Sequence, residues 1–229
     1  MIQTCYTFVT IIKQKMEPNN IADIRKEYRL KTLLENDVGP DPIQQFHRWW
    51  NEAILSNIEE PNAMTLATSN RKGYPSARIV LLKGMSNDGF VFYTNYESRK
   101  AAELKENPNA SLLFFWKELE RQVRIEGTVT KISEEKSKEY FLSRPVLSKI
   151  GAWSSPQSSV IPGRDHLEEN VIKYQQQFDD GEIPKPPHWG GYEVKPTRIE
   201  FWQGRRNRLH DRLQYTFTND KWIIERLAP

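Results

Sequence analysis

The sequence is poor in the residues that build several common kinds of functional site. Its 229 residues include a single cysteine, Cys5, so no disulfide can form within the chain, which favours a reducing, cytoplasmic setting. No cluster of cysteine and histidine has metal-ligand spacing, and neither GxGxxG nor GxxxxGK(S/T) occurs. We therefore expect no metal site and no glycine-rich phosphate loop, so that any bound phosphate must be held by side chains.

Long apolar segments and a large excess of one charge are also absent. No apolar run approaches the roughly 20 residues needed to span a bilayer, so no membrane segment is predicted. The 33 basic and 30 acidic residues leave a formal net charge of +3, which does not indicate a nucleic-acid-coating protein. The first stretch, MIQTCYTFVTII, lacks the basic segment and cleavage site of a signal peptide. A flexible extension over residues 1–23 is expected, with a weak presequence as the alternative.

Short β-branched and aromatic segments separated by turn signals predict antiparallel strands. AMTLATS, PSARIVLLKG and FVFYTN follow one another from residue 63, separated by RKG and SNDG. ASLLFFWK and RQVRIEGTVTKI form a second pair, and GYEVKPTRIEFWQ, RLHDRLQYTF and KWIIERL close the chain. Because tight turns join most of these strands, we expect a mainly β fold, an antiparallel barrel with peripheral helices, in one domain over residues 24–229.

Helical spacing indicates where the peripheral helices lie. One helix is predicted to begin at Asp41-Pro42, where an N-cap residue precedes a proline at the first helical position. Others are expected from Ser98 and near residues 134–143, followed by a loop rich in Ser, Pro and Gly. The segment HLEENVIKYQQQF then predicts a further helix. Its apolar face comprises Leu167, Val171, Tyr174 and Phe178.

Positive charge is concentrated in EFWQGRRNRLHDR, residues 200–212. If this stretch is a strand, alternation places one basic set on a single face: Arg206, Arg208, His210 and Arg212. A solvated edge strand whose charges only discourage aggregation is an equal alternative. The neighbouring Phe201-Trp202 favours a binding site, since aromatic rings beside guanidinium groups suit a flat, anionic ligand.

Two further segments carry signals for anion binding. In RIVLLK, Arg78 and Lys83 are expected on opposite sides of a strand that is apolar on both faces, which suits two separate phosphates or, equally, two salt bridges. In YTNYESRK, Arg99 and Lys100 lie at the start of a predicted helix, where backbone N–H groups also favour an anion. Ordinary surface charge is the alternative there.

Several longer segments together resemble one family. RIVLLK, FYTNYESRK, LERQVRIEG, YFLSRP, SKIGAWSSPQSS, PPHWGG, IEFWQGRRNRLHDR and the final ERLAP resemble the pyridoxamine 5′-phosphate oxidase family, in order, from about residue 24 to the last residue. The resemblance implies an FMN-binding split β-barrel and a homodimer with two FMN molecules at the subunit interface. Each site would be built from both chains.

The resemblance also implies site residues, carried over by position. Flavin contacts would be Arg78, Ile79, Val80, Leu81, Leu82, Lys83, Tyr93, Thr94, Arg99, Lys100, Gln122, Gln157, Ser158, Trp202 and Arg212. Substrate contacts would be Arg25, Tyr28, Lys83, Tyr140, Arg144, Ser148, Arg208, Leu209 and His210, with Arg208 and His210 at the reacting carbon. The chain departs from the family at Val146-Leu147, where a basic or small polar pair is more usual, which makes Ser148 the least secure phosphate ligand.

The implied activity is FMN-dependent oxidation of pyridoxamine and pyridoxine 5′-phosphate to pyridoxal 5′-phosphate. Oxygen would accept the electrons and yield hydrogen peroxide, within vitamin B6 biosynthesis and salvage. A flavin reductase or a non-catalytic flavin-binding module has no need of the phosphate set Lys83, Tyr140 and Arg144, which counts against both. An RNA-binding module would use similar residues but would show a broad basic surface.

Overall fold

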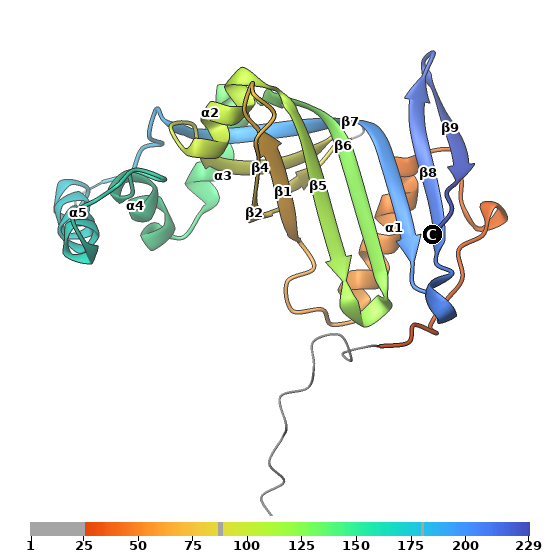
Figure 1. The fold of residues 1–229 in the computed structure, drawn as a ribbon. Coiled ribbons are helices and arrows are strands. Elements are labelled where there is room, and N and C mark those ends of the chain that lie inside the picture. Colours follow the sequence, from red (N-terminus) through yellow and green to blue (C-terminus); the bar gives the residue numbers. More distant parts are fainter. Residues whose placement is uncertain (1–25, 87–88, 180) are drawn as a thin grey trace, which may run out of the picture.

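The computed structural model describes residues 26–86, 89–179 and 181–229; the predicted extension over residues 1–23 lies outside these ranges. In the described part, nine strands form one sheet (Figure 1). They are β1 (Ala63–Ser69), β2 (Pro75–Leu81), β3 (Gly84–Met85), β4 (Phe90–Asn95), β5 (Asn109–Trp116), β6 (Arg121–Lys131), β7 (Trp189–Gln203), β8 (Asp211–Thr218) and β9 (Lys221–Arg226). The order is β2-β1-β5-β6-β7-β4-β3, with β8 beside β7 and β9 beside β8. Every pairing is antiparallel, which confirms that prediction.

The helices lie around this sheet, as expected. They are α1 (Pro42–Leu55), α2 (Arg99–Glu106), α3 (Glu134–Ser143), α4 (Val146–Ser154) and α5 (Arg164–Gln177), with short 3-10 turns η2 (Glu35–Asp37), η3 (Lys117–Leu119) and η4 (Arg206–Arg208). The predicted start of α1 is confirmed, because the Asp41 side chain accepts a hydrogen bond from the Ile43 amide at 2.8 Å. Figure 1 shows α4 and α5 together beyond one end of the sheet, and β8 and β9 at the other end.

The main core lies between α1 and the sheet. Phe46 of α1 is fully buried, with its ring centroid 4.9 Å from that of Phe90 and 5.2 Å from that of Phe114. A second apolar cluster joins the helical region to β7 and contains Phe141, Ile150, Ile183 and Trp189. Val171 and Tyr174 of α5 and Phe178, which directly follows the helix, pack against it. Three of the four residues of the predicted apolar face therefore meet a core, though a satellite one.

β7 is the strand that connects the two ends of the molecule. Its first residues, 189–194, pair with β4, and its last, 198–203, pair with β8. Its register against β6 shifts between Glu126 and Gly127, where a Cβ on Gly127 would lie 2.1 Å from the Lys195 carbonyl oxygen. Only glycine fits this bulge, which lets β7 stay paired along its whole length.

Residues 206–210 are not part of the predicted strand. Residues 206–208 are the 3-10 turn η4, Asn207 and Arg208 have positive φ angles of 55° and 62°, and β8 begins only at Asp211. The reason is topological: Gln203 pairs with Asp211, so the residues between them must reverse the chain from β7 into β8. The basic residues 206, 208, 210 and 212 therefore do not share one strand face.

Two other expectations were wrong. The apolar segment RIVLLK was expected to be buried on both faces, but within the single chain β2 is an edge strand of the sheet and Ile79 is 65% exposed. The predicted loop after α3 contains a helix, α4, which starts directly after Pro145 and includes Gly151. Both residues are typical of loops, although proline is well tolerated at the start of a helix.

Candidate functional site

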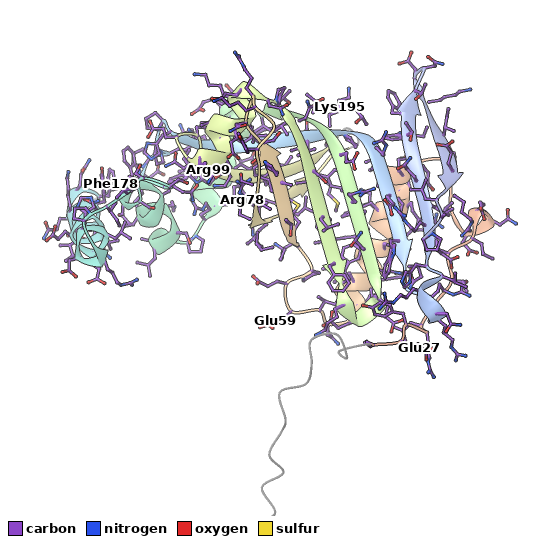
Figure 2. The ribbon with its side chains drawn as sticks, in the orientation of Figure 1. Glu27, Glu59, Arg78, Arg99, Phe178 and Lys195 are labelled. Carbon is purple, nitrogen blue, oxygen red and sulfur yellow. The ribbon has the colours of Figure 1, made fainter. Side chains whose placement is uncertain are left out.

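A cleft of about 810 Å³ is lined by β2, the end of β4, the start of α2, α3, α4 and the first residue of β7. We call it the basic cleft. Predicted site residues among its lining are Arg78, Ile79, Val80, Leu81, Lys83, Tyr93, Thr94, Arg99, Lys100, Tyr140, Arg144, Ser148, Gln157 and Ser158. Figure 2 shows Arg78 and Arg99 near one another on the side of the sheet towards α4 and α5. Arg78 and Lys83, expected on opposite sides of a strand, line the same cleft.

The two arginines at one end of the basic cleft are tied together by Glu103 of α2. Its Oε1 atom accepts from Arg99 Nε at 2.9 Å, and its Oε2 atom lies 3.4 Å from Arg78 Nη2. Thr68 and Ser76 hydroxyls also donate to Oε2, each at 2.5 Å. Burial would raise the pKa of the Glu103 carboxyl, but these hydrogen bonds and the Arg78 charge outweigh it and lower the pKa to about 2.

Lys100 lies beside this pair and has a lowered pKa. Its ammonium group donates to the Gln157 side-chain oxygen at 2.8 Å and to the Thr94 hydroxyl at 3.0 Å. Burial, with a smaller contribution from the charge of Arg78, lowers the pKa of Lys100 to about 8. A bound anion would raise the pKa of this lysine again, because its charge would offset both effects.

Aromatic rings and one arginine form the other end of the basic cleft. Tyr93 stacks on Tyr140 at a centroid distance of 4.0 Å and on Trp189 at 5.2 Å. The Arg144 guanidinium lies 4.7 Å from the Trp189 ring centroid. Its Nη1 atom is buried and, within the described residues, has no hydrogen-bond partner, and burial lowers the Arg144 pKa. A buried, unpaired guanidinium N–H facing a cleft suits an anionic ligand such as a phosphate.

The remaining flavin candidates lie near the far end of β7. Gln122 pairs with Trp202 across β6 and β7, and Trp202 pairs with Arg212 across β7 and β8, so the three side chains form one cross-strand row. Arg212 donates to the buried Glu200 from Nε at 2.7 Å and from Nη2 at 3.2 Å. Leu82 differs from all of these, because its side chain is in the main core and only 5% exposed.

The predicted substrate residues of the C-terminal region gather around the same row. The His210 ring lies 4.5 Å from Trp202 and 6.0 Å from Tyr28, centroid to centroid. The Arg205 backbone amide donates to His210 Nδ1 at 3.1 Å, so the neutral imidazole must carry its proton on Nε2. Burial, then the charge of Arg208, lowers the pKa of His210. Arg208 and Leu209 are exposed on the turn beside it, and Arg25 lies outside the described residues.

The structure thus gathers the predicted residues into two groups, one near each end of β7. The basic cleft is one group, and Tyr28, Trp202, His210 and Arg212 belong to the other. Sequence reasoning missed Glu103 and Trp189 as site residues. Glu103 could have been found from its position four residues after Arg99 on the predicted helix, a spacing that allows an ion pair. Trp189 lies in the motif PPHWGG.

Two classes of feature are not found in the described part of the chain. No three histidine, cysteine, aspartate or glutamate side chains there are grouped so as to hold a metal ion. No helix within residues 26–86, 89–179 and 181–229 has the length and apolar character to cross a membrane.

Comparison with known proteins gives consistent matches along the chain. The pyridoxamine 5′-phosphate oxidase family model matches residues 50–178, and the model of the pyridoxine 5′-phosphate oxidase C-terminal dimerisation region matches residues 189–229. The pyridoxine/pyridoxamine 5′-phosphate oxidase of Cyanothece sp. is 56% identical over 210 residues, which cover 92% of this chain and 99% of the relative. The protein of the same name from Salinibacter ruber is 56% identical over 214 residues, which cover 92% of this chain and 100% of the relative.

Solved structures agree on the fold. PhzG from Burkholderia lata, crystallised with tetrahydrophenazine-1-carboxylic acid, matches with a TM-score of 0.82 at 29% identity, covering 87% of this chain and 99% of that one. A pyridoxamine 5′-phosphate oxidase-related, FMN-binding protein from Nostoc punctiforme matches with a TM-score of 0.67 at 18% identity, covering 84% and 100%. The expected antiparallel split β-barrel is confirmed, and the chain belongs to the pyridoxamine 5′-phosphate oxidase family.

Proposed function

We propose that the protein oxidises pyridoxamine 5′-phosphate and pyridoxine 5′-phosphate to pyridoxal 5′-phosphate, with FMN as cofactor. Oxygen is the electron acceptor and hydrogen peroxide the second product, and the reaction serves vitamin B6 biosynthesis and salvage. The observation that carries the proposal is the basic cleft, where the half-buried Arg144 has a buried Nη1 atom without a partner within the described residues and shares the lining with Tyr140, Ser148 and Lys83. A flavin-binding module that acts on no phosphorylated substrate has no need of this second anion-binding set.

The donors present fit FMN and a phosphorylated substrate together. Arg78, Arg99 and Lys100 offer three cations for the flavin phosphate, and Glu103 holds the two guanidinium groups in place. Arg144, Tyr140, Ser148 and Lys83 form the second set, for the substrate phosphate. A cleft of about 810 Å³ lies within the size range of ligand sites, roughly 300–1,000 Å³.

A homodimer explains why the predicted residues form two groups in one chain. We infer that Trp202, Arg208 and His210 of one subunit complete the basic cleft of its partner. The match of residues 189–229 to a dimerisation region supports this assembly. So do the exposed apolar side chains next to each group: Ile79 is 65% exposed at the basic cleft, and Leu209 is 69% exposed beside His210.

The side chains of the second group orient the substrate for oxidation. When bound, FMN supplies the redox chemistry, taking two electrons from the substrate and passing them to oxygen. Arg208 and His210 position the pyridine ring, and His210 donates a hydrogen bond from Nε2 because Nδ1 is occupied by the Arg205 amide. Tyr28, with Arg25, covers the substrate. This role differs from that of a general base, because the lowered pKa and the occupied Nδ1 both oppose uptake of a second proton.

An absorption spectrum tests the proposal directly. The purified protein is expected to be yellow with a flavin spectrum, and to bleach when pyridoxamine 5′-phosphate is added without oxygen. Readmitting oxygen should restore the colour and yield hydrogen peroxide. A colourless protein that also fails to take up added FMN would refute the cofactor assignment. A yellow protein that pyridoxamine and pyridoxine 5′-phosphate both leave unbleached would refute the substrate assignment.

A further inference from the structure

We propose that Glu120 is a positioning residue that holds residues 26–33, here called the strap, over the Trp202–His210 pair. The expected effect of Glu120 on substrate binding rests on the proposed function, whereas its effect on the position of the strap does not. Glu120 lies between η3 and β6 with its side chain only 4% exposed. Its Oε2 atom accepts from two consecutive strap amides, Arg29 N at 2.7 Å and Leu30 N at 3.0 Å. Hydrogen bonds to a buried carboxylate are strong, because the charge is little screened by water.

The backbone of the same residue holds the surface on which the strap rests. Glu120 is in the left-handed region with φ 54°, and its carbonyl oxygen accepts from the Gly204 amide at 2.8 Å. Gly204 lies directly against the Tyr28 ring, since a Cβ at that position would be 2.7 Å from Tyr28 Cγ. Glu120 thus fixes the strap through its carboxylate and the residue beneath Tyr28 through its carbonyl.

These contacts determine where the Tyr28 ring lies. The ring is perpendicular to Trp202 at 5.7 Å and lies 6.0 Å from His210, centroid to centroid. Among the described residues, the Glu120 carboxylate bonds residues of the strap and neither ring, so we expect its effect on the site to pass through the strap. Further along, Leu33 N donates to Asp211 Oδ2 at 3.0 Å, which anchors the C-terminal end of the strap independently. Loss of the Glu120 contacts should therefore free the Tyr28 end while the strap stays attached at Leu33.

The test compares Glu120→Gln with Glu118→Gln, a matched control at an exposed glutamate in the adjacent turn. Strap mobility is measured by trypsin cleavage after Lys26, Arg29 and Lys31, followed by mass spectrometry. We expect cleavage to become about tenfold faster or more in Glu120→Gln, with the control unchanged, since local opening exposes these bonds. Cleavage rates equal to those of the control would overturn the proposal, whatever the enzyme does.

Kinetics then show whether the strap acts on the substrate. In Glu120→Gln, KM for pyridoxine 5′-phosphate should rise roughly 10- to 30-fold with a smaller change in kcat, because strap contacts contribute to binding. Flavin content and melting temperature should match the control. In a Tyr28→Ala background, Glu120→Gln should raise KM no further, and a full additional increase would show that Glu120 acts by another route.

A second variant and the wild-type activity separate failure of the Glu120 inference from failure of the proposed function. If Glu120→Gln is not recovered folded, Glu120→Asp serves, since it keeps the charge but shortens the reach of the carboxylate; wild-type cleavage rates in that variant would contradict the inference. A wild-type protein that binds no flavin or lacks oxidase activity would refute the proposed function, while the cleavage experiment would still report on Glu120.

Discussion

Nη2 of Arg78 lies 3.4 Å from Oε2 of Glu103, and the other oxygen of that carboxylate bonds Arg99. One buried acidic side chain thus holds two cations of the basic cleft, which come from β2 and α2. Arginine side chains have many rotamers, and holding them in place before a ligand arrives lowers the entropic cost of binding. The proposed function therefore gives Glu103 a part in flavin binding, although Glu103 does not line the basic cleft.

The first prediction concerns this carboxylate. Glu103→Gln should weaken FMN binding about tenfold, since Arg78 and Arg99 lose the charge that orients them. Glu106→Gln, an exposed position on the same helix, is the control. The pKa near 2 is below that of a free carboxyl, so Glu103 stabilises the fold above pH 4.5 and loses this effect as the pH falls towards 2. Between pH 4.5 and pH 2, the free energy of unfolding of the wild type should fall by roughly 2 to 3 kcal/mol more than that of Glu103→Gln. Urea unfolding at several pH values measures both.

The second prediction separates Arg212 from Arg208. Arg212 bonds both oxygens of Glu200, which is 3% exposed, so Arg212→Leu should cost about 1–3 kcal/mol of stability and lower FMN occupancy, partly restored by excess FMN. Arg208 is exposed on its turn, so Arg208→Leu should stay yellow and stable but lose about 100-fold in kcat/KM. Titration of FMN into both variants, followed by fluorescence and turnover, distinguishes them. Equal loss of flavin in both would refute this division of roles.

The third prediction concerns the protonation of His210. Nitrogen NMR of histidine-labelled protein should show an unprotonated Nδ1 and a protonated Nε2, assigned by comparison with His210→Gln. At pH 6.5, where a free imidazole is half protonated, His210 should remain mostly neutral because its pKa is lowered by burial and by Arg208. Because the unfolded chain binds this proton more readily than the folded one, the contribution of His210 to the free energy of unfolding is full above pH 6.5 and falls as the pH is lowered further. The opposite tautomer would show that the Arg205 contact does not persist in solution.

The fourth prediction tests whether each site is built from two subunits. Arg144→Gln disables the basic cleft and Arg208→Leu disables the C-terminal group, so each homodimer should be nearly inactive. Mixed dimers should contain one intact site and one doubly defective site, so random co-assembly should recover about a quarter of wild-type activity. Co-assembly of Arg144→Gln with Lys83→Gln, two variants of the same group, is the control and should recover none. Absence of recovery in the first mixture, with dimers present, would place the whole site in one chain.

Much of the fold was predictable because it follows local rules. The Asp41-Pro42 helix start and the antiparallel strands depend on capping, turn residues and a period of two, all visible within about ten residues. The turn at 206–208 was not predictable in this way, because basic residues at every second position from Arg206 to Arg212 imitate a strand. Only the pairing of Gln203 with Asp211 requires the reversal.

The sequence indicated which residues belong to the candidate site, but not which of them lie together or which faces are exposed. An apolar strand such as RIVLLK has the same pattern whether its second face meets its own core or another surface, so the 65% exposure of Ile79 could not be foreseen. The roles of Glu103 and Glu120 depend on contacts with distant residues. Glu120 bonds amides about 90 positions away, a relationship that no local pattern encodes.

The length of β7 sets the spacing between the two groups of site residues in one chain. Trp189, at its first residue, supports Arg144 in the basic cleft, and Trp202, near its last, faces His210. Deleting one residue within β7 would turn every later side chain to the opposite face and draw the two ends closer together. Insertions and deletions within the strand should therefore be damaging, because they change the spacing and facing of the site residues at its two ends.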